Sequence, residues 1–144
     1  MNYYHSKYDV LHGTSYSEVM HLARKEYATV KKLTKRQPYV RSSYFAKDKV
    51  FLALFWEHLA QKHRADRKYR LQYYNCALDL LRHSTLTPAT LFSEADKNTM
   101  LPRFYGRTKQ GLAFCVQVKQ DKRTGRKDFI SVFPEADRRK LRNK

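Results

Sequence analysis

Three segments near the end of the chain carry side chains that could bind RNA. Residues 103–108, 112–119 and 128–133 alternate in polarity as strands do, and side chains two positions apart share one face of a strand. One face of such a sheet would gather cationic, aromatic and hydrogen-bonding groups, from Arg103, Tyr105, Arg107, Gln117, Lys119 and Ser131. Cations bind phosphates and aromatic rings stack on unpaired bases, so the pattern favours an RNA-binding sheet face.

The same face could support RNA cleavage without a metal ion. This reaction needs a base for the ribose 2′-hydroxyl, cations for the charge on the phosphorane, and an acid for the leaving oxygen. Five residues are candidate catalytic groups, with Ser131 holding the phosphate and Tyr105 transferring a proton: Tyr105, Arg107, Lys109, Lys119 and Ser131. Five others are candidate nucleic-acid contacts: Arg103, Gln117, Arg123, Arg126 and Lys127.

The block Arg103–Lys119, followed by Asp128–Pro134, resembles phage-type barnase-like proteins. These belong to the superfamily that groups barnase, EndoU, colicin-type tRNases and RelE-like toxins. The resemblance implies helices packed on a C-terminal antiparallel sheet and metal-independent cleavage of RNA. It places Ser131 in a catalytic set, with Arg107, Lys109 and Lys119 as the basic residues. Related nucleases often use a His or Glu on the sheet, and no central position here has either, so the general base stays unassigned.

Net charge points to the same class of partner. The chain of 144 residues has a formal net charge of +17, and residues 138–144 contribute five cations to it. Most of the excess therefore belongs to the body of the protein. A charge of this size attracts polyanions, and phosphate neutralisation makes such binding depend on salt.

Helices are expected before residue 85 and strands after residue 102. Helical spacing predicts one helix from Ser17 to Gln37, a second from Phe45 or Ala46 to Leu59, and a third over residues 67–82, with residues 89–101 as a loop. The expected fold class is α+β, with N-terminal helices packed on a C-terminal antiparallel sheet of three to four strands. The expected organisation is one domain over residues 1–136, helical over about 15–84 and sheet over about 102–134, with a basic tail at 137–144.

The core face of this sheet follows from strict alternation. Leu112, Phe114, Val116 and Val118 are expected to face the helices, completed by Ile130 and Val132 on the last strand. Phe129, Ser131 and Phe133 are then expected on the opposite face.

Several other classes of site are not indicated. Cys76 and Cys115 are isolated, and no spacing of His, Cys or carboxylates suggests a metal, so no metal and no cofactor is expected. The chain has no phosphate-binding glycine loop and no apolar stretch of membrane-spanning length. Residues 1–10 lack the apolar core of a secretory signal, and a cytoplasmic protein without a membrane partner is expected.

The leading hypothesis is an RNA-directed protein that acts as a metal-independent endoribonuclease of toxin or phage-related type. A toxic enzyme would imply an acidic antitoxin or immunity protein as a partner. The alternative is a non-catalytic RNA- or DNA-binding module. A third hypothesis is an interaction protein whose basic surface meets an acidic protein.

Overall fold

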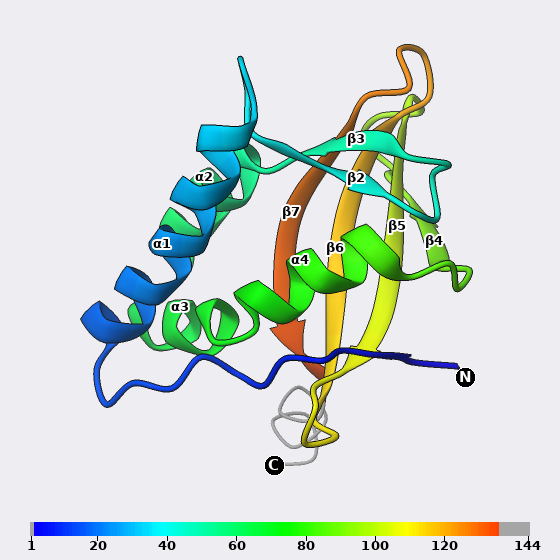
Figure 1. Ribbon diagram of the computed structural model, residues 1–144. Helices are drawn as coiled ribbons and strands as arrows, with labels where there is room; N and C mark the ends of the chain where they lie inside the picture. The colour runs from blue at the N-terminus through cyan, green and yellow to red at the C-terminus, as the bar shows by residue number, and fades with distance from the viewer. Residues whose placement is uncertain (1, 136–144) are drawn as a thin grey trace.

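A computed structural model describes residues 2–135, in which seven strands form one mixed sheet and four helices pack against it (Figure 1). In chain order the elements are β1 (Tyr4–His5), α1 (Tyr16–Leu33), β2 (Tyr39–Ser42), β3 (Asp48–Phe51), α2 (Ala53–Ala60), α3 (Arg64–Leu71), α4 (Tyr74–His83), β4 (Ala89–Phe92), β5 (Thr99–Arg107), β6 (Ala113–Asp121) and β7 (Lys127–Pro134).

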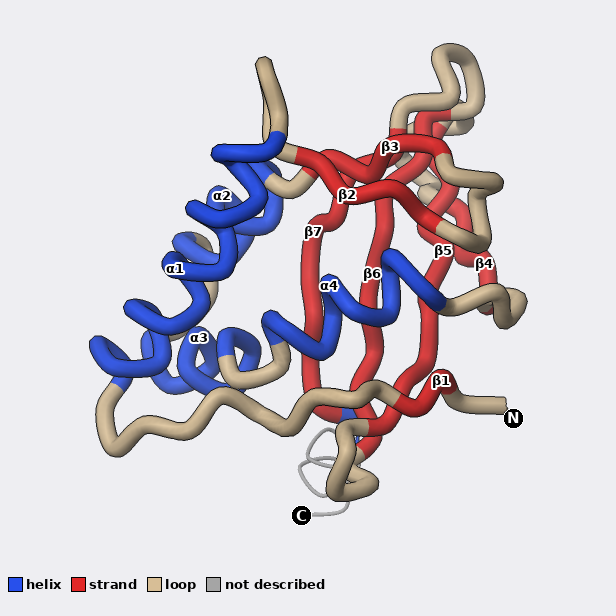
Figure 2. The backbone as a smooth tube through the Cα atoms, viewed as in Figure 1, coloured by secondary structure: helices blue, strands red, loops and turns tan. Residues whose placement is uncertain are grey.

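The sheet is larger and more complex than the sequence predicts. Its strand order is β1-β5-β6-β7-β3-β2, and β4 also pairs with β5. The β1–β5 and β3–β7 pairs are parallel, whereas the other pairs are antiparallel. The expected antiparallel sheet of three to four strands is therefore wrong. One strand precedes the first helix, and the β2–β3 hairpin lies inside the segment 15–84 that was expected to be helical (Figure 2).

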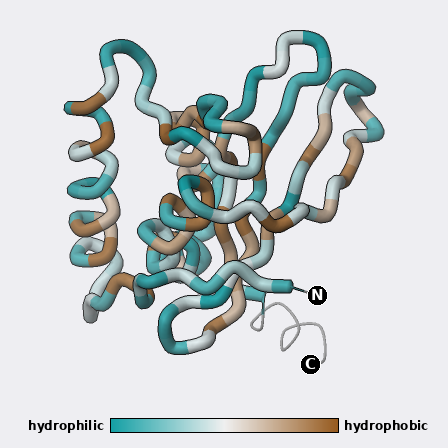
Figure 3. Tube along the Cα trace, turned by 45° about the vertical axis from the view of Figure 1, so that its right-hand side comes forward, coloured by the Kyte–Doolittle hydropathy of each residue, from teal (hydrophilic) through white to brown (hydrophobic). Residues whose placement is uncertain are grey.

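The helices also differ from the expected ones in number and extent. The first begins after Ser15, whose hydroxyl accepts a hydrogen bond from the Glu18 N–H at 3.2 Å, a common helix cap. Along α1 hydrophobic and hydrophilic positions alternate at helical spacing (Figure 3). The second helix begins only at Ala53, because Val50 and Phe51 pair with β2. The third helix, expected over residues 67–82, is two helices in the structure. Helix α3 ends at Leu71 and α4 begins at Tyr74, with a turn at residues 72 and 73 between them.

Strands β5, β6 and β7 form an antiparallel meander with an irregularity in the last pair. Gln117 lies opposite Ser131 and Val118 lies opposite Phe129, so Ile130 is an extra residue on β7. This β-bulge reverses the alternation beyond it. Phe129 is 0% exposed in the core, and Ile130 is only half-buried, so the expectation that Ile130 faces the core is wrong. Leu112, also expected in the core, precedes β6 and is 46% exposed.

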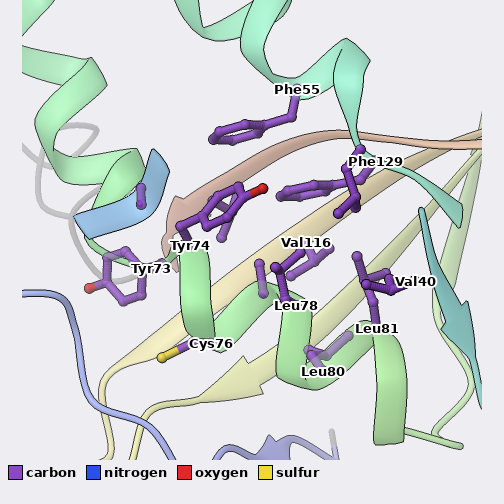
Figure 4. Packing of buried hydrophobic residues seen from close by; sticks show 14 of the residues in the cluster. Val40, Phe55, Tyr73, Tyr74, Cys76, Leu78, Leu80, Leu81, Val116 and Phe129 are labelled. Carbon is purple, nitrogen blue, oxygen red and sulfur yellow. The ribbon is translucent and has the colours of Figure 1, made fainter. Parts of the chain in front are cut away.

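The core lies between α4 and the face of β5, β6 and β7 that carries Phe104, Phe114 and Val116. Figure 4 shows Phe55 of α2 and Tyr74 of α4 beside Phe129 of β7. The Phe55 and Phe129 rings are stacked, with centroids 4.8 Å apart and an interplanar angle of 5°. The position of β7 therefore depends on an aromatic cluster that α2 and α4 complete.

Strand β1 is attached to the body by a buried carboxylate. Asp79 of α4 is 1% exposed, and its Oδ2 accepts hydrogen bonds from the Ser6 hydroxyl at 2.8 Å and the Tyr4 hydroxyl at 3.0 Å. The Lys7 N–H also reaches this oxygen, at 3.3 Å. Burial, followed by the Asp79 hydrogen bond, raises the pKa of Tyr4, so this phenol stays protonated and keeps donating. Three donors of the N-terminal segment thus share one acceptor.

We expect the Asp79→Ala substitution to loosen the N-terminal segment. Removing a charged acceptor from buried donors costs about 2–3 kcal/mol of unfolding free energy. Faster hydrogen exchange at residues 4–8, together with a lower urea midpoint, would measure this effect. The matched variant Asp66→Ala removes an exposed carboxylate and should change neither quantity. Unchanged exchange in Asp79→Ala would show that other contacts hold β1.

Candidate nucleic-acid interface

The meander places the predicted site residues on its outer face, defined as the side of β5, β6 and β7 that points away from α4. Arg103, Gln117 and Ser131 form a row across the three strands, because Gln117 lies opposite both of the others. Arg103 Nε donates to Oε1 of Gln117 at 3.0 Å, and Gln117 Nε2 donates to the Pro102 carbonyl at 3.0 Å. Gln117 is only 6% exposed, so it orients Arg103 and is itself buried.

A second guanidinium joins this row from α3. Arg70 donates a short hydrogen bond to the Ser131 hydroxyl. The guanidinium carbons of Arg70 and Arg103 lie 5.5 and 5.3 Å from the centre of the Phe133 ring. Two guanidinium groups over one ring bring together donors that suit a phosphate group.

Beyond the Arg103–Gln117–Ser131 row, toward the β5–β6 turn, the outer face carries a carboxylate, Glu135, as well as a cation, Arg107. The Tyr3 hydroxyl donates to Oε2 of Glu135 at 3.0 Å. The guanidinium carbon of Arg107 lies 4.4 Å from the centre of the Tyr3 ring, and Tyr105 meets that ring edge-on with centroids 6.2 Å apart. Tyr3 therefore touches an acidic group from the end of β7 and a basic group from β5.

Arg107 also donates to the Gly111 carbonyl at 2.9 Å. This bond ties its side chain to the β5–β6 turn, where Gly111 has a φ of +94° that favours glycine. Lys109 lies in the same turn and is exposed, and its N–H bonds the Tyr8 carbonyl at 2.9 Å. Lys109 thus lies at the turn beyond the rows of the outer face.

The remaining predicted residues lie toward the other end of the meander. Arg123 is exposed in the β6–β7 turn, and Arg126 forms an ion pair with Asp128 at 3.2 Å. Lys127 is 7% exposed, and its Nζ bonds Oδ2 of Asp48 at 2.7 Å. Lys127 therefore joins β7 to β3 within the protein, and we assign it a structural role.

Lys119 is exposed on the outer face, and it lies close enough to His58 to influence its titration. Burial lowers the pKa of His58 below its ordinary value, and the positive charges of Lys62 and Lys119 lower it further. The lowered pKa favours the neutral form of this α2 imidazole.

The sequence analysis assigns no site role to four residues near these groups: Tyr3, His58, Arg70 and Glu135. Glu135 continues the period-two pattern of Ser131 and Phe133, so the pattern contained a signal for it. Arg70 belongs to a helix with several cations, and nothing in the sequence distinguishes it from its neighbours. Tyr3 arrives through the parallel pairing of β1 with β5, which joins distant parts of the chain.

No known family model matches the chain, and no curated protein or solved structure is significantly similar to it. Within residues 2–135 no three His, Cys, Asp or Glu side chains gather as a metal ion would require. None of the helices in this range is both long and apolar enough to cross a membrane.

Proposed function

We propose that this protein is an endoribonuclease that cleaves single-stranded RNA on its outer face and needs no metal ion. One observation carries the proposal: a carboxylate, Glu135, and a guanidinium, Arg107, both contact the side chain of Tyr3. A base and an anion-binding cation are thus held together on a sheet face with further cations. The resemblance to barnase-like and RelE-like proteins supports the same reaction, and a cytoplasmic toxin or phage-related setting belongs to the proposal.

The proposed reaction uses the groups of the outer face. The Glu135 carboxylate takes the proton of the ribose 2′-hydroxyl, and the 2′ oxygen then bonds to phosphorus. The bond from phosphorus to the 5′ oxygen breaks, and the Tyr105 hydroxyl gives its proton to that oxygen. The products are a 2′,3′-cyclic phosphate and a 5′-hydroxyl, and solvent returns the proton from Glu135 to Tyr105. Arg107 stabilises the negative charge of the phosphorane.

Binding of the neighbouring nucleotide is assigned to the first row. Residues two apart on a strand lie about 7 Å from each other, so Arg103 and Arg107 flank Tyr105 at this spacing. Arg103 and Arg70 bind the adjoining phosphate. The exposed Lys119 and Arg123 extend the positive surface toward the other end of the meander.

The direct test is incubation of the purified protein with tRNA, mRNA and ribosomes in the presence of EDTA. Cleaved RNA with cyclic phosphate ends is the expected result. Intact RNA in every case, at protein concentrations that saturate binding, would contradict the enzymatic proposal.

The Arg103→Ala variant is expected to bind single-stranded RNA more weakly. One phosphate contact fewer lowers the slope of log Kd against log salt concentration by about 0.7. The control is Lys32→Ala, which removes the same charge from an exposed position on α1. Fluorescence anisotropy with a labelled oligonucleotide at four salt concentrations measures both slopes. Equal slopes for the two variants would mean that the charge acts without regard to its place.

A non-catalytic RNA- or DNA-binding module is the alternative, and one observation favours it. The groups assigned to catalysis already have partners within the protein: Arg107 bonds Gly111 and Glu135 bonds Tyr3. A rigid, satisfied surface suits recognition. Tight salt-dependent binding without cleavage would support this alternative. An acidic antitoxin or immunity protein would then no longer be expected as a partner, because there would be no toxic activity to inhibit.

A further inference from the structure

Strand β4 leaves one of its edges unpaired within the described part of the chain. It pairs with β5 through the register Ala89–Arg103 to Phe92–Met100, and residues 2–135 provide no second strand for its other edge. Figure 1 shows β4 beside β5 at the border of the molecule. Unpaired strand edges are templates for a further strand.

The hydrogen-bonding pattern identifies which main-chain groups point outward. The Ser93 N–H donates to the Thr99 carbonyl at 3.4 Å, so this pair belongs to the hydrogen-bonded set of the hairpin. Such pairs alternate along an antiparallel ladder, so Leu91 and Ala89 also direct their main-chain groups toward β5. The N–H and C=O groups of Thr90 and Phe92 then face away from the sheet. Pro102 lies opposite Thr90, where its missing N–H removes no hydrogen bond to β4.

The side chains of β4 are unusually exposed for a sheet strand. Phe92 is 64% exposed and Leu91 is 43% exposed, on opposite faces of the strand. The strand Ala89–Phe92 contains no charged residue and no proline, and both of these protect strand edges from further pairing. The β4–β5 hairpin accordingly shows hydrophobic positions at the periphery of the molecule (Figure 3).

A pocket adjoins this edge on each side of the sheet. One pocket, of about 490 Å³, is lined by Tyr44, Phe45, Pro88, Thr90, Met100, Pro102 and Gln120. The other, of about 410 Å³, is lined by Asn2, Thr85, Leu86, Thr87, Pro88, Ala89 and Tyr105. Strand addition takes its affinity from main-chain bonds and its specificity from pockets for alternate side chains. Both requirements are present at β4.

The positive charge of the protein indicates what kind of segment could pair with the free edge of β4. With a net charge of +17, two copies of this chain repel each other, so a second copy is disfavoured. Lys122 lies with its Nζ 5.1 Å from the Phe92 ring centre, and Lys97 and Arg123 are exposed in the adjoining turns. Of the nearby acids, Asp96 is bound by the Thr99 hydroxyl at 2.9 Å, and Glu94 is exposed.

We propose that an extended acidic segment of a partner protein adds to the edge of β4 as a further strand. Its main chain pairs with Thr90 and Phe92, its alternate apolar side chains enter the two pockets, and its carboxylates meet the surrounding cations. This inference goes beyond RNA cleavage and does not rest on it, because it uses the outward main-chain groups of β4. The two sites adjoin each other, since Tyr105 of the outer face lines one of the two pockets.

The test uses a fluorescent eight-residue peptide of alternating valine and glutamate, with blocked ends, added to the full chain at physiological salt. We expect saturable binding to the wild-type protein and at least tenfold weaker binding to Thr90→Pro, which removes an outward N–H. The matched variant Thr90→Val keeps the N–H and should bind as the wild type does. Thermal unfolding should agree among the three proteins, since β4–β5 pairing does not use this N–H.

A second peptide, with proline in place of each valine, has the same charge and cannot pair as a strand. Equal binding of both peptides, or equal binding to Thr90→Pro, would reduce the effect to general charge attraction and overturn the proposal. Absence of binding at 1 mM peptide (about 4 kcal/mol or less of affinity) would also overturn it. If Thr90→Pro unfolds, Phe92→Pro replaces it, because it removes the other outward N–H without adding charge, and it should weaken binding at least fivefold.

RNA is the other macromolecule that the test distinguishes. Single-stranded RNA should bind Thr90→Pro as tightly as it binds the wild type, because it does not use the outward N–H of Thr90. RNA binding that weakens in Thr90→Pro as much as peptide binding does would assign the edge to RNA and overturn the partner proposal. Failure of the RNA proposal would instead appear as absent cleavage with peptide binding intact.

Discussion

Replacing Glu135 by glutamine is expected to lower the rate of the proposed RNA cleavage by about 100-fold or more, the usual contribution of a general base. Glutamine keeps the size of the side chain and still accepts a hydrogen bond from the Tyr3 hydroxyl, so the site stays assembled. It cannot take a proton from the 2′-hydroxyl. RNA affinity should stay equal or rise slightly, because a negative charge leaves the binding face. Single-turnover cleavage rates and anisotropy titrations measure the two quantities separately.

Two controls make this result specific to Glu135. Glu94→Gln removes an exposed carboxylate in the β4–β5 turn and should leave the rate unchanged. Tyr3→Phe removes the hydrogen bond to Glu135 and keeps the carboxylate, so the rate should fall by a smaller factor. A Glu135→Gln variant that cleaves at the wild-type rate would end the assignment of Glu135 as the base, and His58 would then be the next group to test.

The second large effect concerns stability. Phe129→Ala is expected to lower the unfolding free energy by about 3–5 kcal/mol, as large core truncations do. Phe129 is 0% exposed and stacked on Phe55 at 4.8 Å, so the change leaves a cavity between α2 and β7. Domains are stable by only about 5–15 kcal/mol, and the variant would therefore lose a large share of its stability.

The neighbouring variant Ile130→Ala is the matched control, because strict alternation and the β-bulge give opposite expectations for it. A half-buried side chain outside the core should cost about 1 kcal/mol. Urea denaturation of both variants, read by the fluorescence of Trp56 and by circular dichroism, measures the difference. An Ile130→Ala variant less stable than Phe129→Ala would contradict the bulge and restore simple alternation.

The three strands of the meander were predictable because each alternates within a single segment. The β-bulge was not predictable, since one extra residue on β7, opposite the step from Gln117 to Val118, leaves no mark on composition. It moves Phe129 to the core and Ile130 out of it. The helix expected from Phe45 failed for a related reason: Val50 and Phe51 fit a helical stripe, but they are committed to a hairpin with β2.

The short strands could not be predicted because distant segments create them. Strand β1 has two residues and exists only through its parallel pairing with Gly106 and Arg107. Strand β4 has four residues, all exposed, so no polarity pattern announces it. The prediction of an antiparallel sheet of three to four strands therefore captured the part of the sheet with local contacts and missed the rest.

For the candidate site, period-two alternation brought Arg103, Gln117 and Ser131 into one row, as the register has them. The same reasoning treated Gln117 as a surface contact, whereas it is buried and orients Arg103. Lys127 looked like one more cation in a basic turn, yet its partner Asp48 comes from a different hairpin. An ion pair between residues far apart in the chain, such as Lys127 and Asp48, cannot be predicted from the sequence of either segment alone.

The link between Tyr3 and Glu135 joins positions 132 residues apart. During synthesis the chain leaves the ribosome from its N-terminus, so Tyr3 has no partner until synthesis has passed residue 135. The pairing of β1 with residues 106 and 107 is delayed in the same way. Contacts of such separation also form slowly in folding, because a long loop must close first. A nascent or truncated chain therefore lacks the proposed base, and a protein that cleaves RNA would be harmless to the ribosome that is still translating it.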